Sequence, residues 1–181
     1  CLRLRLGELP HNIHMQQNGF SESDFVPEIR SLGPETRSEL LSPYNWFRFY
    51  IRRRDVHNAQ WVLYIDSDAV VRGDLTPLFR LPLRCNDPDG CIAAAVSYST
   101  AHNPQPLKFY LCDRVSTFAP EIMGETAINA GILLMNLEAW TSANVLERWS
   151  ALVEEHKRSC LWKLASQPEL QLLQTNGIFQ I

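Results

Sequence analysis

The chain has 181 residues, of which 45% are hydrophobic and 20% charged, and its formal net charge at pH 7 is −3. This is the composition of a soluble globular protein with enough chain to bury a core, so we expect a single domain over residues 1–181. The slightly acidic balance argues against nucleic acid as a partner. No apolar run is long enough for a membrane-spanning helix, so membrane attachment is expected only through a segment outside this chain.

Strands and helices alternate along the predicted secondary structure. The leucines of "LRLRL" alternate as in a strand with one buried face, and Ser42-Pro43 resembles the N-cap and first position of a helix. Strands are predicted at 2–6, 61–65, 91–99, 131–137 and 178–181, the one at 61–65 being buried on both faces. Helices are predicted at 43–56, from Thr76, at 142–158 with Ser142 as the cap, and, as helix or loop interrupted at Pro168, at 161–177. The alternation predicts an α/β fold with a mostly parallel sheet flanked by helices.

Five cysteines leave at least one without a partner in the chain. Cys85 and Cys91 enclose the loop-forming stretch "CNDPDGC", and either a local disulfide or two free thiols fit this spacing. The cysteines and histidines do not have the spacing of a structural zinc site.

The stretch "WVLYIDSDAVV" places two aspartates directly after an apolar strand. Ligands of open α/β sheets bind beyond the carboxyl ends of the strands. Side chains two apart in an extended chain point to the same side, so Asp66 and Asp68, with Ser67 between them, are expected to converge. Two carboxylates held together repel unless a proton or cation lies between them, and Mg²⁺ or Mn²⁺ prefers such oxygen ligands. The alternative is a pair of turn or capping aspartates.

The helix predicted from Pro43 has an apolar stripe that consists of Tyr44, Phe47 and Ile51. Arg48 falls within this stripe. A guanidinium that faces a core requires an anion. Either Asp66 or the diphosphate of a ligand meets this requirement, unless the arginine extends along its stem to solvent.

Asn129-Ala130-Gly131 precedes the apolar stretch "ILLMNL". Small residues allow a ligand to approach the backbone, and an asparagine offers both a donor and an acceptor. A plain turn before a strand explains the same residues.

Together these stretches resemble glycosyltransferase family 8, of GT-A fold, and in particular its galacturonosyltransferase-like branch. The matching pieces keep the order of the family and extend over roughly residues 42–173. They are "NWFRFYI", "WVLYIDSDAVVRGDLTPLF", "KFYLCDRVSTFAPEI", "INAGILLMNLEAW" and "LWKLASQPEL".

The resemblance implies a retaining transfer of a hexose or hexuronic acid from a UDP-sugar to an acceptor hydroxyl of a carbohydrate or glycoconjugate. It implies Mn²⁺ or Mg²⁺ on Asp66 and Asp68, with Arg48 on Asp66 or the phosphates. The implied donor-binding residues are Arg48, Asp66, Ser67, Asp68, Asn129, Ala130 and Gly131, and the implied catalytic residues are Asn129 and Gln167. The Golgi lumen or secretory pathway is the location expected by analogy.

The chain departs from the family pattern at two places. Gln167 matches the glutamine of the family's Asp-Gln pair, but Ser166 stands where the aspartate is expected. The family's third metal ligand is a histidine in a glycine-rich segment near the C-terminus, and none of the five histidines here has that context. We therefore expect this chain to be part of a catalytic domain.

Two other functions fit parts of the sequence. A catalytically impaired domain of the same fold would bind a sugar or nucleotide without turnover. In phosphatases of the haloacid dehalogenase type, the first aspartate of a similar Asp-x-Asp pattern forms an aspartyl-phosphate. That pattern stands near the N-terminus in such enzymes, whereas about sixty residues precede it here.

Overall fold

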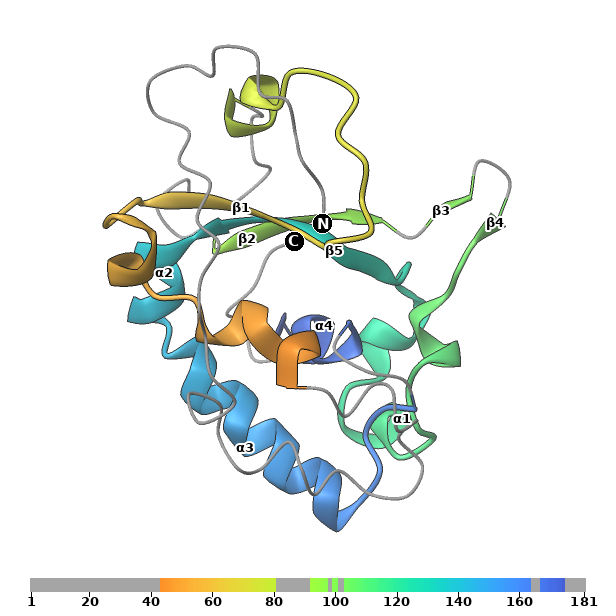
Figure 1. Ribbon diagram of the computed structural model, residues 1–181. Helices are drawn as coiled ribbons and strands as arrows, with labels where there is room; N and C mark the ends of the chain where they lie inside the picture. The colour runs from red at the N-terminus through yellow and green to blue at the C-terminus, as the bar shows by residue number, and fades with distance from the viewer. Residues whose placement is uncertain (1–42, 81–91, 98, 101–102, 164–166, 175–181) are drawn as a thin grey trace.

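A computed structural model of the chain describes residues 43–80, 92–97, 99–100, 103–163 and 167–174 (Figure 1). The strands expected at 2–6 and 178–181, the cap expected at Ser42 and the pair Cys85 and Cys91 lie outside these residues.

The described elements alternate between strands and helices as the sequence predicts, and many of the helical turns are 3-10 helices (η). The strands are β1 (Trp61–Ile65), β2 (Ala93–Ser97), β3 (Ser99–Thr100), β4 (Asn103–Pro104) and β5 (Ile128–Asn136). The 3-10 helices are η4 (Pro43–Tyr50), η5 (Arg53–Val56), η6 (Thr76–Arg80), η7 (Leu107–Phe109) and η8 (Pro120–Gly124). The α-helices are α1 (Val115–Phe118), α2 (Leu137–Ser142), α3 (Val145–Arg158) and α4 (Pro168–Gln174).

The main sheet has the strand order β1-β5-β2, and both of its pairings are antiparallel. The expectation of a mostly parallel sheet is therefore not confirmed in the described part of the chain. β1 and β2 do run in the same direction, because each is antiparallel to β5, but β5 lies between them. A strand that is apolar on both faces has the same sequence pattern in either direction, so the pattern did not reveal the orientation of β5.

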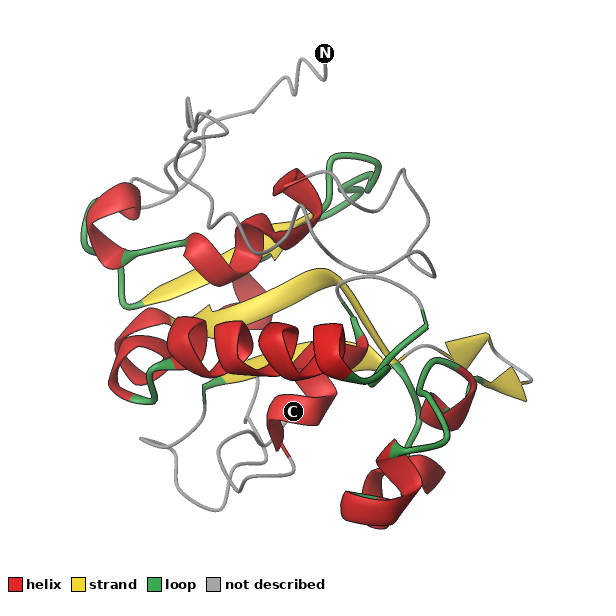
Figure 2. Cartoon of the chain, turned by 90° about the horizontal axis from the view of Figure 1, so that it is seen from below, coloured by secondary structure: helices red, strands yellow, loops and turns green. Residues whose placement is uncertain are grey.

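Helices cover one face of this sheet (Figures 1 and 2). Val62 and Tyr64 of β1 pack against the core on that side. The side chains of Leu63 and Ile65 point to the other face. There they line a hollow, which is also lined by Ile132, by η6 and by the loop that follows β1. All five residues of β1 are half-buried rather than buried on both faces, because β1 is the edge strand of the described sheet.

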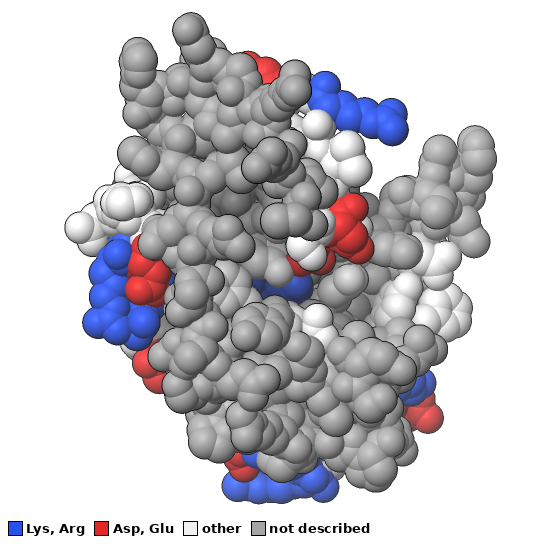
Figure 3. All heavy atoms as spheres, in the orientation of Figure 1, with Lys and Arg blue, Asp and Glu red and all other residues white. Residues whose placement is uncertain are grey.

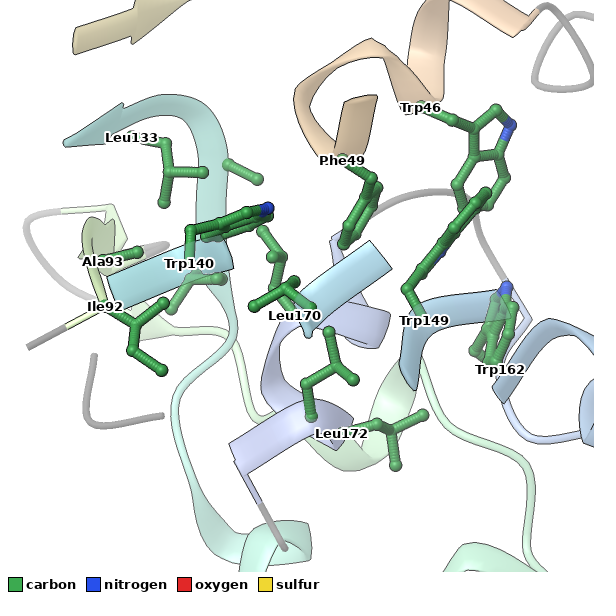
Figure 4. Packing of buried hydrophobic residues seen from close by; sticks show 14 of the residues in the cluster. Trp46, Phe49, Ile92, Ala93, Leu133, Trp140, Trp149, Trp162, Leu170 and Leu172 are labelled. Carbon is green, nitrogen blue, oxygen red and sulfur yellow. The ribbon is translucent and has the colours of Figure 1, made fainter. Parts of the chain in front are cut away.

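Tryptophans dominate the core beneath the sheet (Figure 4). The ring of Trp149 on α3 stacks on Phe49 of η4, with 4.7 Å between the ring centroids, and lies 5.6 Å from Trp46. These aromatic contacts fix η4 against α3. They thereby hold the segment that carries Arg48 under the sheet.

Helix boundaries differ from the predicted ones, and Pro168 begins α4 instead of interrupting a helix. The helix expected at 43–56 is divided into η4 and η5, and its aromatic-rich sequence has only modest α-helix propensity. Ser142 ends α2 instead of capping α3, whose preceding residue is Asn144. The pattern missed α2, which begins where the Asn136 side chain accepts hydrogen bonds from the amides of Glu138 and Ala139, both at 3.2 Å.

A disulfide joins Cys112 to Cys160, 48 residues apart in sequence. The sequence pattern indicates a different pair, Cys85 and Cys91. Loop composition can indicate cysteines that are close in sequence, but it contains no signal for contacts between distant segments. None of the helices in the described part of the chain is long and apolar enough to cross a membrane.

Candidate functional site

Asp66 follows the last residue of β1 and remains tied to the sheet. Its amide donates to the carbonyl of Gly131 on β5 at 2.8 Å, while its carbonyl accepts from the amide of Ala69 at 3.0 Å. The second bond closes a turn over Ser67 and Asp68. The expectation that Asp66 and Asp68 share one side of an extended chain is therefore wrong, because the backbone turns between them.

The Asp66 carboxylate is oriented by two side chains that both reach Oδ1. The hydroxyl of Tyr64 donates to this oxygen at 2.6 Å, and Nη2 of Arg48 lies 3.5 Å from it. The Arg48 side chain is 4% exposed and that of Asp66 is 37% exposed. No hydrogen bond or ion pair to Oδ2 is seen among the described residues, so the carboxylate has one restrained oxygen and one available oxygen.

Arg48 is one of the buried charged residues beneath the sheet. Its guanidinium carbon lies 4.9 Å above the centroid of the Tyr64 ring, a cation–π distance. Of the alternatives that the sequence left open for Arg48, the contact with Asp66 is the one observed. The tyrosine therefore contacts both members of the ion pair.

Tyr64 remains a hydrogen-bond donor at neutral pH. Burial is the main cause that raises its pKa, and the hydrogen bond to Asp66 raises it further, while Arg48 opposes the shift. The net upward shift keeps the phenol protonated beside the carboxylate.

Asn129, Ala130 and Gly131 lie within β5, not in a turn before it. Because β5 is antiparallel to β1, its beginning meets the end of β1, and Gly131 comes to lie beside Asp66. A Cβ at Gly131 would be 2.7 Å from Oδ2 of Asp66 and 3.0 Å from Oδ1 of Asn129. The absence of a side chain at Gly131 thus makes room for the carboxylate.

The Asn129 side chain bends back over its own strand. Its Oδ1 accepts from the Gly131 amide at 2.9 Å. Its Nδ2 group makes no hydrogen bond within the described residues, so it is available to a ligand. Asn129 is half-buried at the same strand junction as Asp66.

The structure places the other expected site residues in different surroundings. Ser67 and Asp68 are exposed in the turn after β1, and Ala130 is fully buried in β5. Gln167 is half-buried just before α4, and among the described residues no hydrogen bond joins it to Asp66 or Asn129. The structure therefore brings Arg48, Asp66, Asn129 and Gly131 together, and leaves Gln167 outside that set of contacts.

Two residues that support this junction, one beside Asp66 and one behind the start of β5, were not among the sequence candidates. Tyr64 lies two residues before Asp66, and side chains two apart in an extended chain point to the same side. This spacing is the sequence signal that would have identified Tyr64. Gln171 contacts the beginning of β5 from α4, more than forty residues away in sequence. Sequence spacing contains no signal for that contact.

The donor set suits a hard cation. Asp66 offers a carboxylate oxygen and Asp68 an exposed carboxylate, and Mg²⁺-type ions are commonly held by one or two carboxylates together with substrate phosphates. Among the described residues, no group of three or more His, Cys, Asp or Glu side chains lies close enough together to hold a metal. Figure 3 shows acidic and basic atoms close to one another near the middle of one face.

Comparison with known proteins identifies the family of the chain. The family model described as "Glycosyl transferase family 8" matches residues 10–179. The chain belongs to glycosyl transferase family 8. This confirms the resemblance inferred from the motifs, and membership of the family implies a GT-A-like fold.

The relatives of this family 8 chain include plant and bacterial enzymes. It is 32% identical over 141 residues to "Hexosyltransferase GAUT11" of Arabidopsis thaliana, covering 75% of this chain and 24% of the relative. It is 28% identical over 154 residues to "Probable galacturonosyltransferase-like 3" of the same plant, covering 80% and 41%. A 30% identical match over 87 residues is the "Lipopolysaccharide 1,2-glucosyltransferase" of Escherichia coli (strain K12), covering 48% and 22%.

The chain spans only about a quarter to two fifths of the lengths of the two plant relatives. No solved structure matches it significantly.

Proposed function

We propose that the junction of β1 and β5 binds the diphosphate of a UDP-sugar together with Mn²⁺ or Mg²⁺, and that the protein transfers a hexose or hexuronic acid to an acceptor hydroxyl with retention. The observation that carries the proposal is the Asp66 carboxylate, held through Oδ1 by Arg48 and Tyr64 and facing Gly131 with Oδ2. Membership of glycosyl transferase family 8 supports the reaction class.

Each residue of the junction has a chemical task in this proposal. Asp66 and Asp68 would hold the cation, whose chemistry when bound is to stabilise negative charge on the departing nucleotide as a Lewis acid. Arg48 aligns Asp66 through the ion pair, and Tyr64 fixes the rotation of the carboxylate. Asn129 offers its Nδ2 group to a sugar hydroxyl at the β5 side of the site. Gln167, just before α4, is also proposed as a catalytic residue.

The proposed class of sugar donor rests on the names of the relatives. Their printed names include galacturonosyltransferase and glucosyltransferase, which supports a hexuronic acid or hexose donor and a carbohydrate acceptor. The Cys112–Cys160 disulfide supports an oxidising compartment such as the Golgi lumen, because disulfides persist in secretory compartments and are rare in the cytosol.

Calorimetric titration with UDP, with and without Mn²⁺, tests the proposal. We expect UDP to bind in the presence of Mn²⁺, and Asp66→Asn to weaken this binding at least tenfold because one charged cation ligand is lost. The control is Asp74→Asn. Asp74 accepts a hydrogen bond from the Thr76 amide at 2.9 Å, and an asparagine side chain makes the same turn bond, so binding should be unchanged.

Turnover of UDP-sugars then separates the remaining functions. Mn²⁺-dependent binding with turnover supports a transferase, whereas binding without turnover identifies a nucleotide-sugar-binding domain of the same fold. Phosphatase activity that Asp66→Asn abolishes, without any UDP binding, would refute the proposal.

A further inference from the structure

The side chain of Gln171 on α4 hydrogen-bonds to the backbone that leads into Asn129. Its Oε1 accepts from the Ile128 amide and its Nε2 donates to the Thr126 carbonyl, both at 3.0 Å. Gln171 is 2% exposed. These are the two bonds that one residue of a neighbouring parallel strand makes, since such a residue donates to one carbonyl and accepts from the amide two residues later.

The opposite edge of the same backbone segment is also paired. The Leu107 amide donates to the Glu125 carbonyl and the Ala127 amide donates to the Gln105 carbonyl, both at 2.8 Å. Residues 125–128 are therefore held from two sides, by main chain on one and by a single side-chain amide on the other.

This support lies where the sheet itself is irregular. Ala95 of β2 is opposite Leu133, but the next residue, Val96, is opposite Asn129, so residues 130–132 of β5 have no partner in β2. The ladder with β2 therefore does not fix the backbone between Asn129 and Gly131, although the Asp66 amide holds the Gly131 carbonyl from the β1 side. The last residue that Gln171 contacts is Ile128, two residues before this unpaired stretch.

We infer that Gln171 is a positioning residue of the proposed transferase: its amide takes the place of one strand residue and fixes the segment that presents Asn129 and Gly131 to the sugar donor. The inference rests on the proposed function. Gln171 itself contacts the backbone at residues 126 and 128 rather than the junction residues. It acts through the strand, and its loss should misplace Asn129 while leaving the Arg48–Asp66 pair in position.

The test combines Gln171→Met with amide hydrogen exchange and kinetics in the full chain. Methionine keeps the size of the side chain but loses both hydrogen bonds. We expect exchange of the Ile128 amide to accelerate at least tenfold, while the Ala127 amide, bound to Gln105, stays protected. We also expect kcat with the UDP-sugar to fall at least tenfold, since small displacements of positioning groups have large kinetic effects. The affinity for UDP with Mn²⁺ should stay within twofold.

The control for general destabilisation is Leu172→Ala, which removes buried packing from the same helix and keeps the Gln171 side chain. It should change the melting temperature but not kcat or Ile128 exchange below the transition. An equal fall of kcat in both variants, or unchanged kcat in Gln171→Met, would overturn the inference. If the wild-type chain neither binds nor turns over the UDP-sugar, the proposed function fails, and Ile128 exchange still decides whether Gln171 holds the strand.

Discussion

At the scale of single residues, Gly131 is the one of the three described glycines where an added Cβ would meet other atoms. A methyl group there would lie 2.7 Å from Oδ2 of Asp66, closer than non-bonded atoms allow, and the opposite oxygen is already held by Tyr64 and Arg48. We expect Gly131→Ala to rotate the carboxylate out of place. Mn²⁺-dependent UDP binding should weaken at least tenfold in a calorimetric titration, with a destabilisation of about 1–3 kcal/mol from the forced shift.

Gly124→Ala is the matched control for this substitution. A Cβ at Gly124 meets nothing within 4 Å, so both stability and UDP binding should be unchanged. If Gly131→Ala also binds UDP normally, the close approach of Asp66 and Gly131 has no role in binding.

The sequence could predict those site residues whose chemistry conflicts with their surroundings. Arg48 interrupts an apolar stripe, and Asp66 follows an apolar strand, so each one draws attention without knowledge of the fold. Tyr64 and Gln171 do not stand out, because a tyrosine in a strand and a glutamine in a helix are ordinary. Their importance comes from the atoms that they contact, and these depend on the tertiary structure.

At the scale of elements, the end of α3 depends on a neutral histidine. His156 is 8% exposed and stacks on Trp162 with 3.9 Å between the ring centroids. Its Nδ1 accepts from the amides of Leu161 and Trp162 at 3.1 and 3.4 Å. Burial lowers the pKa of His156 to about 4, since the charged ring would lose hydration and could not accept these bonds.

This pKa predicts that the fold loses stability in mild acid. Between the ordinary histidine pKa of about 6.5 and the folded value, the unfolded chain binds a proton that the native chain does not. Stability from this group is therefore complete above about pH 6.5 and falls as the pH drops toward 4, by at most about 3 kcal/mol. Urea unfolding at a series of pH values measures the change.

His156→Gln should flatten this dependence, because glutamine offers an acceptor oxygen that does not titrate. The control is His57→Asn at an exposed left-handed position, where asparagine is well tolerated. This control should leave the slope between pH 6.5 and 4 as in the wild type. Equal slopes in wild type and His156→Gln would show that other groups cause the acid sensitivity.

Element positions were more predictable than element directions. The apolar runs correctly indicated β1, β2 and most of β5, because burial selects apolar residues whatever the direction of the strand. The antiparallel insertion of β5 between β1 and β2 has no such signal. It nevertheless decides the site, since only this direction brings the beginning of β5, with Asn129 and Gly131, to the end of β1.

At the scale of the whole molecule, the region around α1 is joined to the end of α3 by both covalent and non-covalent contacts. The Cys112–Cys160 disulfide spans 48 residues that include all of β5. Beside it, the Cys112 amide donates to the Leu161 carbonyl at 3.0 Å and the Lys163 amide donates to the Tyr110 carbonyl at 2.9 Å. These hydrogen bonds keep the two segments adjacent in the native state with or without the disulfide.

The disulfide should therefore act mainly on the unfolded chain, by restricting a long loop. For a loop of this length the chain-entropy relation gives about 4 kcal/mol, so the Cys112→Ser, Cys160→Ser double variant should melt roughly 10 °C lower than the oxidised wild type. Reducing agent should lower the melting temperature of the wild type by a similar amount and leave that of the double variant unchanged. Because Asp66 and Gly131 are held by separate contacts, UDP binding at 25 °C should be retained. An unchanged melting temperature in the double variant would mean that the cross-link contributes no stability, and a further fall on reducing this variant would point to another disulfide.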